Sequence, residues 1–245
     1  LLSRVLVAAC AWSESGKSWT SELPSGQVMV DGVEREYRFF VPANPPSDPM
    51  PLLIAVHGGG GRDYAYPLED SFTALAEEEG VLVVFPLSEL LPPNEGEWQL
   101  NTTPQSRHDI AFIEALIAQM AATHDVDASR VYVTGYSLGA MFVYELACQL
   151  GPQIAAVAAY AGSMPVTPDS CEPGAGLPVL HIHGEDDYII AYDNSWDWKA
   201  WDTVGTMMDI PSLVTFWKTT NACQQTTQRD FGSSSHIVHD GCNDD

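Results

Sequence analysis

The sequence predicts an α/β protein in which a mostly parallel central sheet carries helices on both faces. Two continuous apolar runs, residues 52–56 and 81–85, are typical of strands buried on both faces. Between them, residues 68–79 have the apolar spacing of a helix, and Gly80 follows where a helix commonly ends. Strands that alternate with helices favour parallel pairing, because each helix provides the crossover between two strands.

The flanking segments continue this pattern. Residues 27–41 read as two strands joined at Asp31 and Gly32, and this residue pair is a strong signal for a β-hairpin. Residues 107–123 have the apolar spacing of a long helix. Further short strands are expected at residues 131–134, 154–160 and 178–183.

Composition limits the class of protein. A chain of 245 residues with 45% hydrophobic residues can bury a full core, and one large domain is the simplest interpretation. The net charge is −23, from 33 acidic and 10 basic residues. Such a surface repels phosphate backbones and anionic lipids, so we expect no nucleic-acid partner. We interpret the excess of acidic residues as a means of keeping the protein soluble or as an adaptation to salt. No apolar run reaches about 18 residues, so we expect no segment that spans a membrane. We also expect a monomer.

The chain opens on a short apolar stretch, residues 1–10, that resembles the end of a secretory signal. Its last residues, Val-Ala-Ala-Cys, also resemble a bacterial lipoprotein signal, in which the cysteine (here Cys10) is lipidated after cleavage. The alternative is a buried first strand with an incidental cysteine. We expect residues 1–26 to be a signal remnant and leader, and the protein to be secreted or to be a periplasmic or cell-surface lipoprotein.

The cysteine count fits export. When Cys10 is set aside, four of the five cysteines remain, and four cysteines permit three pairings. We expect sequence neighbours to pair, Cys148 with Cys171 and Cys223 with Cys242. The sequence contains no Cys-x-x-Cys or histidine-rich metal spacing, so we expect no metal site.

The most informative motif is Gly-Tyr-Ser-Leu-Gly at residues 135–139. It follows an expected strand and precedes a helical pattern of apolar residues. Gly-x-Ser-x-Gly in that context is typical of the nucleophile elbow of serine hydrolases, a sharp turn that strains the backbone of the serine. Its two glycines are small enough for the strand and the helix to approach each other. The motif therefore predicts Ser137 as a nucleophile.

A serine nucleophile needs donors for the oxyanion as well as a base and an acid that orients the base. The run His-Gly-Gly-Gly-Gly at 57–61 directly follows a buried strand, and the N–H groups of successive glycines can face a developing oxyanion. We expect one donor at Gly59 or Gly60 and the other at the N–H of Leu138. The alternative for a glycine run is a flexible turn, which this position disfavours. His57 precedes the serine, and we interpret it as support for the turn.

The acid is expected in a turn after a strand downstream of the elbow, because the catalytic residues of such enzymes follow the order serine, acid, histidine. The turn after residues 178–183 offers Glu185, Asp186 and Asp187. Spacing alone does not choose between these three carboxylates.

Taken together, the motifs resemble the secreted α/β-hydrolases that include polyhydroxybutyrate depolymerases, feruloyl esterases and acetylxylan esterases. The similar segments are residues 53–58, 131–141, 155–162 and 179–192. In that group the last segment reads His-Gly-x-x-Asp, and its aspartate is the acid, which selects Asp187 here. The elbow of the group often has asparagine where Leu138 stands, a tolerable departure because the donor is the backbone.

The resemblance implies an α/β-hydrolase fold and a serine esterase that needs no cofactor and acts through an acyl-enzyme. The implied substrates are polyhydroxyalkanoate or the feruloyl or acetyl esters of plant polysaccharide. Two alternatives remain open. One is a peptidase or acyltransferase on the same fold, and the other is a catalytically inactive relative that binds carbohydrate.

The resemblance also raises a question about the base. The histidine of the group lies in Gly-Gly-Gly-His-x-Trp-Pro, a motif that this sequence lacks. Only His236 and His239 follow Asp187, and we interpret both as surface or strand residues. We therefore expect the base beyond residue 245, a catalytic domain at 27–245 that is truncated at its C-terminus, and little or no esterase activity of the chain alone.

Two aromatic residues are candidates for an acyl or sugar pocket. Trp98 lies in an expected loop, where binding residues are common, and packing is an equally open interpretation for it. Tyr136 directly precedes the serine.

Overall fold

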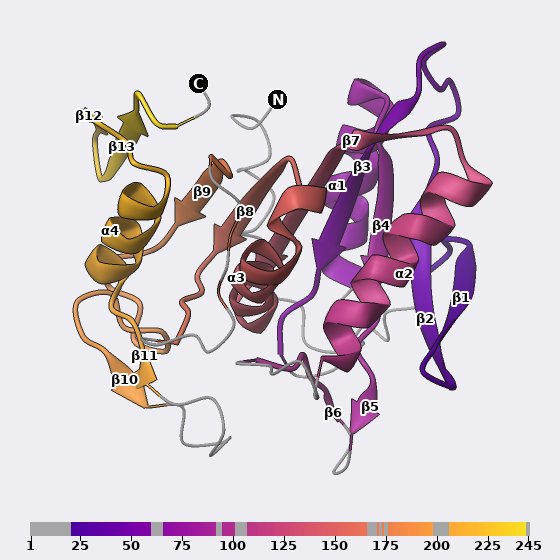
Figure 1. The fold of residues 1–245 in the computed structure, drawn as a ribbon, viewed down its shortest axis with the longest axis horizontal. Helices are drawn as coiled ribbons and strands as arrows, with labels where there is room; N and C mark the ends of the chain where they lie inside the picture. Colours follow the sequence, from indigo (N-terminus) through magenta and orange to yellow (C-terminus); the bar gives the residue numbers. More distant parts are fainter. Residues whose placement is uncertain are drawn as a thin grey trace.

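The structure, a computed structural model, describes residues 21–59, 66–91, 95–100, 107–165, 171, 173, 176–197 and 206–243. Within these residues, a seven-stranded sheet forms the centre of the protein (Figure 1). Its strands, in spatial order, are β1 (Ser25–Val30), β2 (Val33–Phe40), β4 (Leu82–Pro86), β3 (Met50–Val56), β7 (Val126–Tyr136), β8 (Ala156–Tyr160) and β9 (Val179–Ile182).

The other elements surround this sheet. The helices are α1 (Tyr66–Glu79), α2 (His108–Thr123), α3 (Leu138–Leu150), the short 3-10 helix η3 (Gly151–Gln153) and α4 (Ile210–Thr220). The two-stranded sheets pair β5 (Leu90–Leu91) with β6 (Glu95–Gly96), β10 (Trp196–Asp197) with β11 (Thr206–Met207), and β12 (Gln225–Phe231) with β13 (Ser234–Asp240). None of the described helices is long and apolar enough to cross a bilayer.

Strand pairing confirms the predicted fold class. The pairs from β4 through β3, β7 and β8 to β9 are all parallel, whereas β1–β2 and β2–β4 are antiparallel. The hairpin between β1 and β2 turns at Asp31, with φ 50°, and Gly32, with φ 82°. Two successive positive φ values are what a tight two-residue hairpin requires, and Asp-Gly supplies them at low strain.

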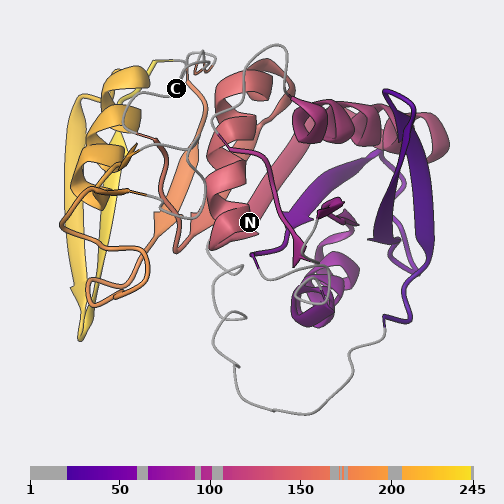
Figure 2. The ribbon, with the colours of Figure 1, turned by 90° about the horizontal axis from the view of Figure 1, so that it is seen from below.

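Alternate residues of the central strands pack on opposite faces of the sheet. Ile54 of β3 belongs to the core cluster that contains Phe112 of α2 and Phe142 of α3. Its neighbour Ala55 belongs to a second cluster with Phe72 of α1. Figure 2 shows the same arrangement, with α1 on one side of the sheet and α2 and α3 on the other. The strands are therefore buried on both faces, as their continuous apolar runs predict.

Beyond β9, the chain forms α4 and the β12–β13 hairpin. Asp209 caps α4 by accepting a hydrogen bond from the N–H of Ser212 at 2.8 Å. Trp217 of α4 stacks on Tyr144 of α3, with ring centroids 5.9 Å apart, so that α4 covers the same face of the sheet as α3. The hairpin itself is almost entirely exposed along both strands.

Two disulfides confirm the predicted pairing. Cys148, near the end of α3, is bonded to Cys171, and Cys223, after α4, is bonded to Cys242. Each bridge closes a short loop of the chain. Cys10 and the rest of the predicted leader up to residue 20 lie outside the described residues.

Candidate active site

The turn between β7 and α3 has the geometry of a nucleophile elbow. Ser137 is the single residue between the two elements, and its backbone angles are φ 54° and ψ −123°. This conformation is costly for a residue with a side chain, and it persists only where the surroundings fix it. Two backbone bonds do so here: the N–H of Ser137 donates to the carbonyl of Tyr160 at 2.9 Å, and its carbonyl accepts from the N–H of Met141 at 3.1 Å.

The two glycines of the motif allow this tight turn. A Cβ atom added to Gly135 would lie 2.5 Å from the carbonyl oxygen of Gly139. A Cβ atom added to Gly139 would collide with the carbonyl oxygen of His57, in the neighbouring loop after β3. Both contacts are with backbone, which cannot move aside as a flexible side chain can. The predicted need for small residues at both positions is confirmed.

The loop after β3 lies directly against the elbow. A Cβ atom added to Gly58 would lie 3.4 Å from Cβ of Ser137, and one added to Gly59 would lie 3.4 Å from Cδ2 of Leu138. The structure thus brings together two of the residues predicted to supply oxyanion donors, Gly59 and Leu138. Gly60, the alternative donor, lies outside the described residues.

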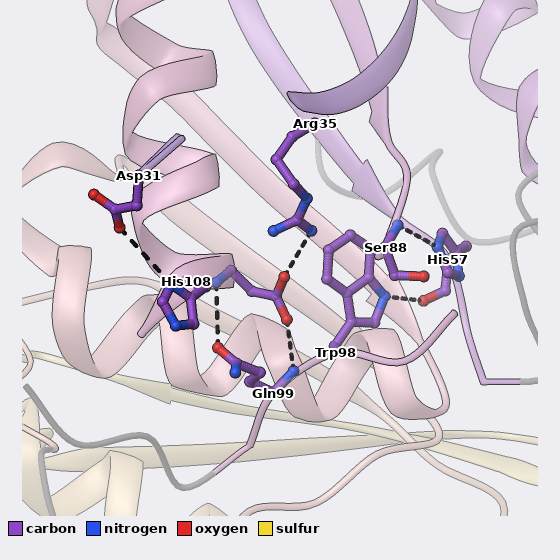
Figure 3. A network of polar contacts seen from close by, with 8 residues as sticks. Asp31, Arg35, His57, Ser88, Trp98, Gln99 and His108 are labelled. Atoms are coloured by element: carbon purple, nitrogen blue, oxygen red, sulfur yellow. Dashed lines mark hydrogen bonds and ion pairs between the residues drawn. The ribbon is translucent and has the colours of Figure 1, made fainter. Parts of the chain in front are cut away.

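His57 supports this loop from inside the core. Its side chain is fully buried, and its Nε2 accepts a hydrogen bond from the N–H of Ser88 at 3.2 Å (Figure 3). Because Nε2 is an acceptor, the neutral ring carries its proton on Nδ1 and donates it to the carbonyl oxygen of Gly58 at 2.7 Å. These contacts fit the structural role that the sequence predicts for His57.

Trp98 packs in the core beside His57. Only 1% of its surface is exposed, and its ring stacks on Phe142 with 4.9 Å between centroids and 4° between planes. Its indole N–H donates to the carbonyl of His57 at 2.9 Å. Of the two interpretations that the sequence left open for Trp98, these contacts favour packing over a substrate pocket.

Tyr136, the second pocket candidate, is partly exposed and stacks on Tyr160, with 5.4 Å between ring centroids. Burial raises the pKa of its hydroxyl, with smaller contributions from Tyr160 and from the charge of Asp187. Tyr136 pairs with Tyr160 of β8, and Tyr160 pairs with Ile182 of β9, so the turn that carries Asp187 begins at the same end of the sheet as the elbow.

The turn after β9 holds the Asp187 carboxylate through its own backbone. Oδ1 accepts hydrogen bonds from the N–H groups of Ile189 and Ile190, both at 2.9 Å. Nε2 of His183 donates to the carbonyl of Ile190 at 2.8 Å and lies 3.6 Å from Oδ2 of Asp187. The carboxylate is therefore oriented but accessible, with 20% of the side chain exposed. Glu185 and Asp186, the other predicted candidates for the acid, are exposed on the same turn.

The two histidines that follow Asp187 in sequence both lie on β13. His236 is exposed, and His239 shares a hydrogen bond of 2.9 Å with the hydroxyl of Thr226 on β12. Both are strand residues, as predicted. Within the described part of the chain, no hydrogen bond or ion pair joins either of them to Ser137 or Asp187.

Burial of His181 on β9 keeps its imidazole neutral. Its Nδ1 shares a hydrogen bond of 2.7 Å with the hydroxyl of Tyr144 on α3. Burial, with a smaller effect of the neighbouring His183, lowers the pKa of His181 to about 3. His181 is therefore a neutral, hydrogen-bonded histidine.

Sequence reasoning missed a buried ion pair between Arg35 of β2 and Asp109 of α2. Their side chains are 3% and 4% exposed and lie 2.7 Å apart. The sequence did contain a signal for it. Arg35 has the same phase in its strand as the buried Tyr37, and Asp109 continues the buried stripe of α2 that includes Phe112. Asp109, although it is charged and lies at the start of the helix, is thus a core residue.

The strand order, the elbow and the adjacent glycine loop define the chain as an α/β-hydrolase. The model of the Dienelactone hydrolase family matches residues 98–201. The chain is 33% identical over 128 residues to acetylxylan esterase A of Aspergillus oryzae, which is 50% of this chain and 40% of that protein. It is 28% identical over 161 residues to a bifunctional acetylxylan esterase/xylanase of Neocallimastix patriciarum, covering 66% of this chain and 22% of that protein.

Other comparisons extend over more of the chain. Feruloyl esterase C of Emericella nidulans is 27% identical over 246 residues, covering 91% of this chain and 80% of that protein. The solved structure of an acetyl xylan esterase from Aspergillus awamori superposes with a TM-score of 0.60 at 17% identity, covering 89% of this chain and 93% of that one. The chain spans 22% to 49% of the length of the first three curated relatives that it matches. The predicted resemblance to esterases with the α/β-hydrolase fold is confirmed.

Proposed function

We propose that this protein is a carboxylic-ester hydrolase in which Ser137 attacks the ester carbonyl and forms an acyl-enzyme that water then hydrolyses. The observation that carries the proposal is the backbone of Ser137, held at φ 54° between β7 and α3, with Gly58 beside it and Gly59 beside the adjacent Leu138. A strained serine at such a turn is typical of a nucleophile rather than of a structural residue.

Two backbone N–H groups are the proposed oxyanion donors. Leu138 is the first residue of α3, and the N–H groups in the first turn of a helix have no partner within the helix. Gly59 approaches Leu138 from the opposite side of the turn, and Gly60 remains a predicted alternative. One such donor typically stabilises the transition state by about 3 kcal/mol.

Asp187 is the proposed acid that orients the base. Its Oδ1 is occupied by two backbone N–H groups, so Oδ2 is left to accept from an imidazole. The base itself stays a prediction. In this sequence the histidines that follow Asp187 are His236 and His239, and both are candidates.

The proposed substrates are acetyl or feruloyl esters of plant polysaccharide. Support comes from the relatives, whose names include acetylxylan esterase and feruloyl esterase. Polyhydroxyalkanoate is a further candidate that rests on the resemblance of the motifs alone. The two disulfides support a secreted or periplasmic location, since such bonds persist in oxidising compartments. A lipid anchor at Cys10 and a monomeric state remain predictions.

The test is hydrolysis of p-nitrophenyl acetate by the chain and by Ser137→Ala, each with and without added imidazole. Free imidazole can replace a missing base, and the variant corrects for the background reaction of imidazole with the ester. With imidazole added, we expect turnover by the parent that disappears in Ser137→Ala. Turnover without imidazole would favour His236 or His239 as the base, and equal turnover by parent and variant would refute the proposal.

The second step is a panel of acetylated xylan, methyl ferulate, polyhydroxybutyrate and a peptide amide. Release of acetate or ferulate in preference to the other products would establish the polysaccharide esterase. Cleavage of the peptide amide alone would support the alternative of a peptidase.

A further inference from the structure

A continuous series of buried contacts connects the Arg35–Asp109 ion pair to the glycine loop (Figure 3). The Asp109 carboxylate uses both oxygens: Oδ1 accepts from Arg35 at 2.7 Å, and Oδ2 accepts from the N–H of Gln99 at 2.7 Å. The side-chain oxygen of Gln99, Oε1, in turn accepts a hydrogen bond from the N–H of Asp109 at 3.4 Å. The preceding residue, Trp98, donates its indole N–H to the carbonyl of His57 at 2.9 Å.

These contacts fix two consecutive peptide groups of the loop. Trp98 holds the carbonyl of His57, and the His57 ring holds the carbonyl of Gly58 at 2.7 Å. A trans peptide is planar, so its C=O and the following N–H point in opposite directions. Because the Gly58 carbonyl is bound by the buried ring of His57, the N–H of Gly59 is directed away from that ring. Gly59 borders Leu138 of the elbow on its other side.

The ion pair is well suited to hold Trp98 in one place. Arg35 lies over the Phe112 ring, 4.3 Å from its centroid, and Asp109 lies in the first turn of α2, where a helix favours negative charge. A buried ion pair adds little net stability, but its partners tolerate few alternative geometries. The Gln99 N–H is bound to the Asp109 carboxylate of this pair, and Trp98 is the adjacent residue.

We propose that Trp98, anchored through Gln99 to the Arg35–Asp109 pair, is a positioning residue that directs the N–H of Gly59 toward the developing oxyanion. The inference rests on the proposed esterase function, since the oxyanion forms only in acyl transfer. Trp98 does not touch the substrate. Its effect belongs to the transition state, because the ground-state ester carbonyl carries no full charge for the Gly59 N–H to stabilise.

The decisive variant is Trp98→Phe, which keeps an aromatic ring on Phe142 and removes the donor to the His57 carbonyl together with part of the ring. With p-nitrophenyl acetate, under conditions in which the parent turns over, we expect kcat to fall roughly 10- to 100-fold while KM changes little. Phenylboronic acid binds a serine nucleophile as a tetrahedral anion. Its affinity should therefore fall by a similar factor. The thermal midpoint should also fall, because the smaller ring leaves a cavity and the His57 carbonyl loses its donor.

A second variant keeps the proposal testable if Trp98→Phe does not fold. Arg35→Met combined with Asp109→Leu replaces the pair by apolar side chains of similar volume, a change that folded proteins often tolerate. It leaves Trp98 in place but frees the Gln99 N–H. We expect the same decrease in kcat and in boronate affinity, with KM little changed.

The matched control is Asn221→Leu. Asn221 is also buried, and its side chain donates to a main-chain carbonyl, that of Leu177, at 2.7 Å. It lies at the end of α4, on the opposite side of the molecule from α2 (Figure 1). This variant should lower the thermal midpoint without changing kcat or boronate affinity.

The outcomes separate the two proposals. If Trp98→Phe or the double variant lowers only the thermal midpoint, or matches the parent in kcat and boronate affinity, Trp98 is a packing residue and the inference is wrong. If the parent itself neither turns over the ester nor binds the boronate, the proposed function is refuted, and the inference falls with it.

Discussion

The candidate site has two parts that are built in different ways: the elbow side, with Ser137 and the loop after β3, and the acid side, with β9 and the turn that carries Asp187. On the elbow side, β3 and α3 are buried, and the backbone of Ser137 is hydrogen-bonded to Tyr160 of β8 and Met141 of α3. On the acid side, β9 is only half-buried, and the turn that follows exposes 92% of Tyr188 and 67% of Ile189. The elbow side is therefore part of the hydrophobic core, whereas the acid side is a turn on the surface.

The difference lies in what fixes each catalytic candidate. Contacts between residues distant in sequence hold the elbow and its loop, such as the bond from Trp98 to His57. Asp187 is held by groups within three residues of itself in its own turn. Changes on the elbow side should therefore affect folding and activity together, whereas changes on the acid side should affect activity alone.

The largest expected effect is the loss of activity in Asp187→Asn. The asparagine carbonyl can still accept from Ile189 and Ile190, so the turn should keep its shape. The amide NH2 then replaces Oδ2 and cannot accept a hydrogen bond from the base, which takes the wrong tautomer. By analogy with other serine hydrolases, kcat should fall about 10⁴-fold. The free energy of unfolding in urea should change by less than about 0.5 kcal/mol.

Asp186→Asn is the matched control, because it removes the same charge from the neighbouring, exposed position of this turn. Its activity should remain within about twofold of the parent's, since exposed charges have small effects. If Asp186→Asn were the inactive variant and Asp187→Asn the active one, the assignment of the acid would be reversed.

The local features of both halves could be predicted from the sequence. The elbow at Ser137, the hairpin at Asp31 and Gly32, and the turn with Asp187 each depend on residues close together in the chain. Such features follow from backbone preferences and from short hydrogen-bonded motifs. Both can be recognised from a few neighbouring residues of the sequence.

Contacts between distant elements could not be predicted in this way. The Arg35–Asp109 pair joins β2 to α2, and its partners can be matched only when the packing of the helix on the sheet is known. Trp98 could be assigned to a loop, but not to a place beneath His57. Strand β7 also begins at Val126, earlier than the apolar run predicts. Val126 pairs with Met50, and the pairing resumes at Leu52 and Val131 after a register irregularity.

The second comparison is between the two disulfides. Each links residues of similar sequence separation, 23 and 19, so the chain-entropy model gives both about 3 kcal/mol of stabilisation. Cys148 is 3% exposed in α3, whereas Cys223 and Cys242 flank the exposed hairpin. Replacement of Cys148 and Cys171 by alanine should therefore cost more, about 4 kcal/mol, because it also leaves a cavity. Urea unfolding of both double-alanine variants measures the difference, and equal losses would contradict a role of burial.

Glycine-to-alanine changes compare the two halves with the same added methyl group. In Gly139→Ala the new Cβ would collide with the backbone of His57, and we expect a loss of about 3 kcal/mol together with most of the activity. Around Gly184, in the acid turn, no atom lies within 4 Å of such a Cβ. Gly184→Ala should change the free energy of unfolding by less than about 0.5 kcal/mol. A large loss in Gly184→Ala would show that the acid turn is as tightly constrained as the elbow.

His181 joins the two halves, since it lies on β9 and bonds to Tyr144 of α3, and it should make their contact sensitive to pH. Its pKa is about 3 in the folded protein, where burial and the neighbouring His183 disfavour the charged ring, and about 6.5 in the unfolded chain. Between these values the unfolded chain binds more protons, so the stabilisation is complete above pH 6.5 and is lost as the pH falls toward 3. From pH 7 to pH 5 the loss from this residue should be about 2 kcal/mol.

The variant His181→Gln keeps a polar group opposite Tyr144 but does not titrate. Urea unfolding of parent and variant at both pH values isolates the effect, because contributions from His183 and all other groups cancel in the difference. We expect the variant to be less stable than the parent at pH 7 and to lose about 2 kcal/mol less on acidification. If parent and variant lost the same free energy of unfolding on acidification, His181 would take up its proton without breaking its contact with Tyr144. The contact between β9 and α3 would then be looser than the burial of His181 implies.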